Sequence, residues 1–186
     1  MSHRTRHVTA ALIVATAALI APGLARADHE ETALVVDATF IAPETGVHAG
    51  AAGVGGELRF FDDHELMTGS FGAFAAFGQQ GTDQRRDVLD AHFSVGMKPE
   101  DAARVAPYAA LGLHVLHVTT HEVGRQPMTA RGTTLGIGAE VGVMGKASRW
   151  WFYRASVGYL GAIVPGTGDD LGGVVIQFGV GRMIDD

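Results

Sequence analysis

Apolar and polar residues alternate with a period of two along most of this chain. The alternation fills eight segments, each followed by a polar break: Thr32–Ile41, His48–Phe61, Leu66–Gly78, Asp87–Lys98, Ala106–Val118, Arg131–Met144, Trp150–Val164 and Gly172–Ile184. A period of two sends successive side chains to opposite faces of a strand, whereas an amphipathic helix needs a period near 3.6. The pattern therefore predicts an all-β protein, and eight strands separated by turns favour a barrel or a sandwich.

The two faces of these segments differ in kind. In the last segment one face carries Val174, Ile176, Phe178 and Val180, and the other carries Val175, Gln177, Gly179 and Gly181. The chain has 26 glycines, most of them within apolar stretches. A glycine inside a helix costs about 1 kcal/mol relative to alanine, whereas on the inward face of a small barrel it relieves crowding.

The choice of the inward face decides which solvent surrounds the barrel. A water-soluble barrel would need a hydrophilic outer face, but the faces opposite the apolar stripes are mostly Gly, Ser, Ala and Thr with isolated charges. Such a face suits a crowded, hydrogen-bonded lumen, so we expect the apolar stripes to face lipid. Aromatic residues gather near the strand ends, where membrane-interface belts are expected: Phe60, Phe61, Phe77, Tyr108, Trp150, Trp151 and Tyr153.

The connections between the segments alternate in length. Residues 62–65, 99–105 and 145–149 form short connections, and those at Gln79–Arg86, Thr119–Ala130 and Pro165–Leu171 are mostly longer and hold Gly, Pro and charge. The first connection, at 42–47, is short. Short turns on one rim and long loops on the other are typical of outer-membrane barrels with both termini in the periplasm. The longer loops would carry any external binding.

The first 27 residues have the three parts of a cleavable signal peptide. Arg4 and Arg6 precede an apolar stretch at 8–24, and Ala25-Arg26-Ala27 supplies the small residues required for cleavage after Ala27. An uncleaved anchor is the alternative, but the stretch is short for a span of about 20 residues. We therefore expect a signal peptide at 1–27 and one barrel domain at 28–186.

Charge and cysteine content narrow the function classes. Cleavage removes three of the 14 basic residues and none of the 20 acidic ones, which leaves a net charge near −9. Nucleic-acid binding needs a basic face, so it is not expected. The chain has no cysteine, which excludes a disulfide framework.

The signal peptide, the eight alternating strands and stretches such as Pro107-Tyr108-Ala109-Ala110-Leu111-Gly112-Leu113 give the chain a recognisable overall pattern. In this pattern, rather than in one motif, it resembles the small eight-stranded outer-membrane barrels of the OmpA/OmpX type. The resemblance implies an antiparallel up-and-down transmembrane barrel in the outer membrane, with lipid as its partner. The sequence leaves the oligomeric state open, and a monomer is favoured. It departs from them at its end, because such proteins commonly finish on an aromatic residue and this chain finishes Ile184-Asp185-Asp186.

Polar and charged residues of the inward faces form the candidate site. The residues are Asp37, Glu57, Arg59, Asp90, His92, His114, Glu140, Arg154 and Gln177. Unpaired charges inside a closed barrel are costly, so we expect a neutralising hydrogen-bonded network in place of an apolar core. A proton path or a gated pore is the alternative, although eight strands leave a lumen that side chains fill.

Two further constellations carry less specific signals. His114, His117 and His121 would share one face of a helix and bind zinc, but on a strand His114 and His117 point to opposite sides. His92 and Ser94 share a strand face, and Glu140 would orient the imidazole in a nucleophilic site. The inward parity of His92 and Ser94 keeps them from lipid. We therefore expect no catalytic, cofactor-binding or metal-binding residue.

These observations favour a non-enzymatic outer-membrane barrel with a role in envelope structure. A lipid-modifying barrel enzyme similar to lipid A deacylases is the first alternative, and it requires His92 and Ser94 to face lipid. The second is a soluble periplasmic barrel similar to lipocalins, which would enclose an apolar ligand with Phe93, Ile137 and Phe178 inside. The Gly-x-Trp that lipocalins usually show is missing from the first strand.

Overall fold

The structure, a computed structural model, describes residues 31–43, 50–61, 67–80, 84–98, 105–122, 129–163 and 173–184. The expected signal peptide at 1–27, with its cleavage site after Ala27, lies outside these residues. In the described ranges no helix is both long enough and apolar enough to cross a bilayer.

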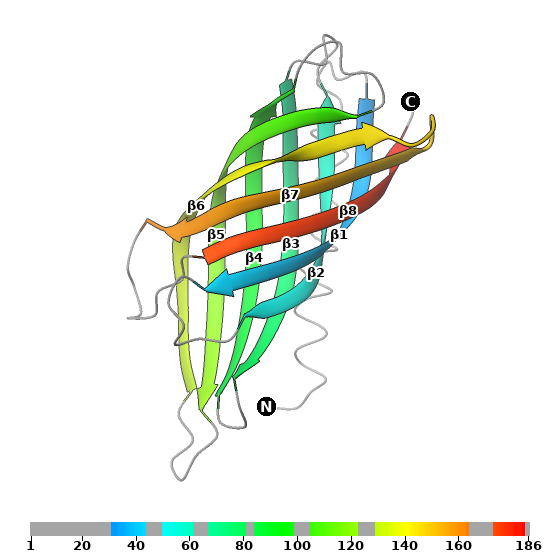
Figure 1. The fold of residues 1–186 in the computed structure, drawn as a ribbon. Helices are drawn as coiled ribbons and strands as arrows, with labels where there is room; N and C mark the ends of the chain where they lie inside the picture. The colour runs from blue at the N-terminus through cyan, green and yellow to red at the C-terminus, as the bar shows by residue number, and fades with distance from the viewer. Residues whose placement is uncertain are drawn as a thin grey trace.

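Eight antiparallel strands close into one barrel (Figure 1). The strands are β1 (Glu31–Pro43), β2 (Ala51–Phe61), β3 (Met67–Gln80), β4 (Gln84–Met97), β5 (Ala106–Glu122), β6 (Thr129–Lys146), β7 (Trp151–Ala162) and β8 (Gly173–Ile184). Each strand pairs with the next in the chain, and β8 closes the barrel on β1 with Thr32 opposite Ile184 and Pro43 opposite Gly173. The predicted all-β, eight-stranded, up-and-down barrel is confirmed.

The strands are long enough to cross a membrane at a tilt. They contain between 11 and 18 residues, and a tilted transmembrane strand needs about 9–11. In Figure 1, β7, β8 and β1 run obliquely across the front of β3, β4 and β5, and the ribbons of β5 and β6 extend furthest at one rim.

The predicted contrast between short turns and long loops is only partly right. Residues 79–80 and 84–86 belong to β3 and β4, which leaves a connection of three residues, 81–83. In the same way β5 and β6 continue until His121 pairs with Thr129. On the opposite rim β4 and β5 are joined by the longer connection 98–105. At the ends of β3, β4, β5 and β6, polar residues extend the backbone ladder instead of ending it, because strand pairing tolerates polar side chains that reach water.

The apolar stripes face outward. Leu113 on β5 is 63% exposed and Phe178 on β8 is 61% exposed, and Phe93 and Ile137 are each 50% exposed. The lipocalin-like interpretation required three of these side chains inside the barrel. It is wrong for this fold, because the parity of their strands turns them away from the lumen.

The expected aromatic belts hold only in part. Phe77, Trp150 and Trp151 are exposed, with the two tryptophans at the β6–β7 rim and Phe77 near the opposite rim. Phe61 and Tyr108 are instead buried, because they share the inward parity of Arg59 and His114 on their strands. Phe60 is also buried.

The lumen has an apolar layer near each rim. Near the ends of β2 and β6, the first layer contains Ala33, Val35, Phe61, Ala106, Tyr108, Ala110, Met144, Phe152 and Met183. The rings of Phe61 and Phe152 lie 5.5 Å apart across it. Near the opposite rim, the second layer contains Ala51, Phe74, Ala76, Val88, Leu116, Val118 and Leu160. The inward positions between these layers are mainly polar residues and glycines.

Candidate functional site

The candidate site is the polar zone between the two apolar layers. All nine residues expected in the lumen have inward parity, and they come from every strand except β3. Asp37, Glu57, Arg59, Asp90, His92 and Arg154 are buried, whereas His114, Glu140 and Gln177 are partly exposed. Strands far apart in the sequence therefore contribute to one continuous cluster.

Arg154 on β7 is the centre of this cluster. Its Nε donates to Asp37 Oδ1 at 2.9 Å and lies 3.2 Å from Glu57 Oε1. Its Nη2 donates to Gln177 Oε1 at 3.1 Å, and its Nη1 lies 3.4 Å from Glu140 Oε2. The guanidinium has several donors in a fixed fork. One side chain therefore connects β1, β2, β6, β7 and β8 across the lumen.

Arg59 supplies the second buried guanidinium. Its Nε donates to Glu57 Oε1 at 2.9 Å, and its Nη2 lies 3.6 Å from Glu140 Oε1. Nη2 has no direct hydrogen-bond partner among the described residues. The guanidinium also lies over the ring of Tyr108, 5.2 Å from its centroid.

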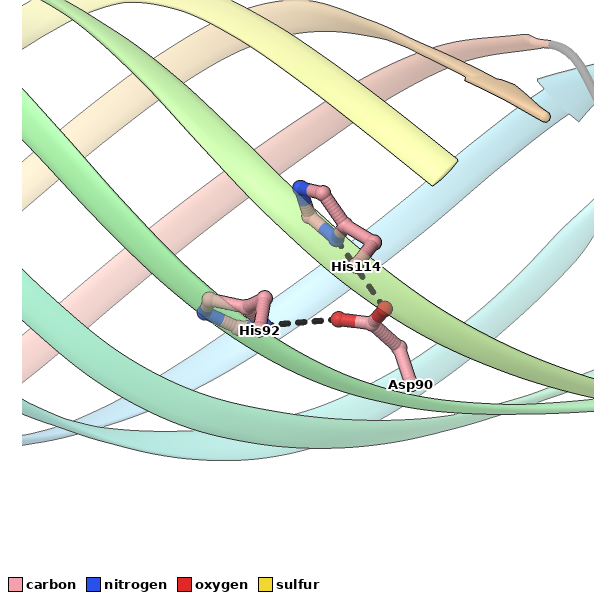
Figure 2. A group of neighbouring side chains, drawn as sticks. All are labelled: Asp90, His92 and His114. Atoms are coloured by element: carbon pink, nitrogen blue, oxygen red, sulfur yellow. Dashed lines mark hydrogen bonds and ion pairs between the residues drawn. The ribbon is translucent and has the colours of Figure 1, made fainter. Parts of the chain in front are cut away.

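Asp90 and two imidazoles make up the remaining part of the cluster (Figure 2). Asp90 Oδ2 lies 2.6 Å from Nδ1 of His92, and Asp90 Oδ1 lies 3.0 Å from Nδ1 of His114. The two rings are 5.2 Å apart and tilted by 30°. The other nitrogen of His92, Nε2, faces Glu57 Oε2 at 3.9 Å. Glu57 therefore joins this triad to the two arginines.

Glycines make room for these side chains. Six of the nine polar residues have a glycine as a cross-strand neighbour: Asp37, Glu57, His92, His114, Glu140 and Arg154. A Cβ at Gly179 would overlap the Asp37 carboxylate, and one at Gly138 would overlap the ring of His114. A Cβ at Gly72 would lie 2.8 Å from His92 Nε2. The glycine-rich inward face thus gives long polar side chains the space to cross a narrow lumen.

A small cavity remains within the polar zone. Its volume is about 50 Å³, and its polar lining comes mainly from Glu57, His92, His114, Glu140, Arg154 and Gln177. Water requires a cavity of roughly 10–15 Å³ and several polar partners. The cavity therefore has room for a few water molecules.

Comparison with known proteins bears on the fold. No family model matches the sequence, and no curated protein matches it. Among solved structures, Neisserial surface protein A is similar with a TM-score of 0.57 and 11% identity, covering 84% of this chain and 96% of that one. The Yersinia pestis attachment invasion locus protein Ail gives 0.55 and 13%, covering 83% of this chain and 97% of that one. A major outer membrane protein of Thermus thermophilus is similar with a TM-score of 0.58 and 12% identity, covering 82% of this chain and 99% of that one.

The chain has the fold of the small outer-membrane barrels. The predicted resemblance to this group is confirmed at the level of architecture. At such low identity the likeness extends to the fold alone, so the role of the lumen residues must be argued from their own contacts.

Among the described residues, the hydrolase constellation considered for His92, Ser94 and Glu140 is not assembled. His92 and Ser94 face the lumen, and both are buried. His92 Nδ1 contacts Asp90, whereas Ser94 Oγ lies 2.7 Å from Ser70 Oγ. A nucleophile needs its base within hydrogen-bond reach. Ser94 is instead engaged with a second serine.

The histidines at positions 114 and 117 point to opposite faces of β5. His114 contacts Asp90 in the lumen, whereas His117 Nδ1 lies 2.9 Å from Thr133 Oγ1 on the outer face. The three-histidine site considered from the sequence spacing does not form on this strand.

Two members of the cluster, Tyr108 and Thr39, are not among the residues expected from the sequence. The Tyr108 hydroxyl accepts from Arg154 Nη1 at 3.3 Å, and Thr39 Oγ1 accepts from Gln177 Nε2 at 3.3 Å. The inward parity of Tyr108 and Thr39 is visible in the sequence. Tyr108 was placed in an aromatic belt because it lies near a strand end.

Proposed function

We propose that the protein is an integral outer-membrane barrel without enzymatic activity, and that its lumen network holds the barrel closed within the envelope. The observation that carries this proposal is the inverted distribution of side chains. Apolar residues such as Leu111, Leu113 and Phe178 are more than half exposed outside. Charged residues such as Arg59 and Arg154 are buried inside. Water would favour the reverse arrangement, whereas lipid favours this one.

The lumen supports a structural role in preference to transport. Apolar layers lie on both sides of the polar zone, and the cavity between them is about 50 Å³. Porins of about 16–18 strands leave an aqueous channel, whereas eight strands leave a lumen that side chains fill. The two arginines and their acidic partners therefore act as a cross-brace between strands.

Membrane lipid is the partner that this surface fits. The barrel closes its own hydrogen-bond ladder through the β8–β1 pairing, which leaves no open edge for a second chain and supports a monomer. Connections 123–128 and 164–172 remain the candidates for an external ligand.

The proposal is tested by fractionating cells that express the full chain. We expect it in the outer-membrane fraction, soluble only with detergent, and migrating differently on gels before and after boiling. A mature chain that stays monomeric in detergent-free buffer would overturn the proposal.

The enzymatic alternative has its own test. Mass spectrometry of lipid A from cells with and without the protein should show the same acylation. A deacylated species that disappears with Ser94→Ala would contradict the non-enzymatic role.

A further inference from the structure

We propose that Asp90, His92 and His114 form a binding site for one divalent transition-metal ion, with Zn²⁺ as its representative. One carboxylate oxygen and one nitrogen from each imidazole lie within 4.8 Å of one another. Figure 2 shows the Asp90 carboxylate beside the two rings, with one oxygen directed at each of them. The proposal depends on these side chains alone, and it holds whether or not the barrel resides in the outer membrane.

The donor set is the one that zinc selects. Zn²⁺ binds imidazole nitrogen and carboxylate oxygen at about 2.0–2.2 Å, so two ligand atoms of a tetrahedral site lie about 3.4 Å apart. The Asp90 oxygens lie 2.6 Å and 3.0 Å from the two Nδ1 atoms. All three ligand atoms lie within 4.8 Å of one another. Side-chain rotations that bring the widest pair about 1.4 Å closer and replace the bridging protons would therefore bring the three atoms to the spacing of a tetrahedral site.

A second observation points to a ligand at this position. Metal-binding histidines usually present their other ring nitrogen to a carboxylate, which fixes the ring and raises its basicity. His92 Nε2 faces the carboxylate of Glu57 at 3.9 Å. Glu57 is fully enclosed and held by Arg59 at 2.9 Å. A carboxylate therefore lies near the second nitrogen of the first imidazole, on the side where a metal-binding histidine is usually supported.

The charge of the lumen matches a divalent cation. The polar zone contains four carboxylates, those of Asp37, Glu57, Asp90 and Glu140, and two guanidiniums, those of Arg59 and Arg154. Two negative charges remain, and an unbalanced charge in such a site is costly. Two protonated imidazoles compensate these charges in the absence of metal, and one divalent ion that displaces their protons would compensate them equally.

The site also has space for a fourth ligand. His92 and His114 both line the cavity of about 50 Å³, which has room for water. His114 retains 15% side-chain exposure. Three protein ligands and a water complete a tetrahedral site. Gly138 and Gly112 keep the space around His114 free, because a Cβ at either position would press on its Nε2.

The test uses the purified full-length protein in detergent, stripped with a chelator and titrated with Zn²⁺ or Co²⁺ alone by calorimetry. We expect one ion per chain and, with Co²⁺, the visible absorption of a tetrahedral site. His114→Gln should weaken binding by more than about 100-fold, since loss of a supporting outer residue alone costs about 10–100-fold. His117→Gln is the matched control, because His117 lies on the same strand but faces outward.

Gel migration before and after boiling verifies that each variant is folded. X-ray absorption of the zinc-loaded protein should show two imidazoles, and Asp90→Asn should weaken binding in the same way as His114→Gln. Equal affinity of wild type and His114→Gln, or loss of binding in His117→Gln only, would overturn the proposal.

Discussion

Replacing Arg154 by methionine tests whether the lumen network holds the barrel together. Arg154 is 3% exposed, and its guanidinium contacts the carboxylates of Asp37 at 2.9 Å and Glu57 at 3.2 Å. Methionine keeps most of the apolar stem but leaves both carboxylates without this cation. Removing one partner of a buried ion pair costs about 3–5 kcal/mol, because the remaining charge is uncompensated. We expect the free energy of unfolding of Arg154→Met to fall by that amount.

The assay is urea unfolding in detergent micelles, followed by tryptophan fluorescence. The chain has two tryptophans. They lie outside the lumen on the outer surface, so the substitution leaves the reporters unchanged. At constant slope, a loss of about 3–5 kcal/mol moves the midpoint to lower urea. Arg154→Lys should lose less unfolding free energy than Arg154→Met, since lysine keeps the positive charge although it lacks the forked donors of the guanidinium.

Two controls separate a lumen effect from the general effect of losing an arginine. Arg85 forms an ion pair with Asp87 at 2.9 Å, but its side chain is 40% exposed, so Arg85→Met should cost about 1 kcal/mol or less. Adding Asp37→Asn to Arg154→Met should recover part of the loss, because fewer charges then remain unpaired. If Arg154→Met and Arg85→Met unfold at the same urea concentration, the network does not stabilise the barrel.

Three further predictions concern the glycines, the outer surface and the lumen. Gly179→Ala should lose about 1–3 kcal/mol of unfolding free energy, because its Cβ would overlap Asp37. Gly69→Ala should be tolerated, because the atom nearest to its added Cβ would lie 3.9 Å away. Equal urea midpoints for the two variants would contradict the crowding argument. Leu113→Lys should cost about 2–4 kcal/mol in lipid vesicles and Val105→Lys, at the rim, about 0–1 kcal/mol; the reverse order would refute the lipid-facing assignment. In planar bilayers the protein should add no steady conductance, since apolar layers close both ends of the polar zone; stable channels would show that the layers do not seal it.

The positions of the lumen residues could be predicted from the sequence because a strand has a period of two. Within each strand the apolar stripe marks the outward face, so the polar residues on the opposite face, such as Glu57 and Arg59 on β2, are placed inward. Their partners could not be predicted in this way. Arg154 contacts Asp37, which is 117 residues away, and that contact depends on the tilt and stagger of the strands around the barrel. These quantities are properties of the closed sheet.

Aromatic and loop predictions failed where local composition was given more weight than parity. Phe61 and Tyr108 lie near strand ends, but both sit an even number of residues from a polar inward side chain of the same strand, Arg59 and His114 respectively. The predicted ends of β3 and β4 were wrong for a different reason. The polar residues around Arg85 read as a loop, yet they pair as β3 and β4 continue beyond the apolar belt.

Glycine and charge are coupled in this lumen by geometry. The cross-strand neighbours of a strand residue lie about 5 Å from it, so a long inward side chain occupies the space above one of its neighbours. A glycine neighbour leaves that space open, as Gly179 does between Asp37 and Arg154. Larger residues on all inward positions would force the charges together or into the apolar layers. The alternation of glycine with large outward residues, which made the strands recognisable, is therefore also the condition for a charged network inside a narrow barrel.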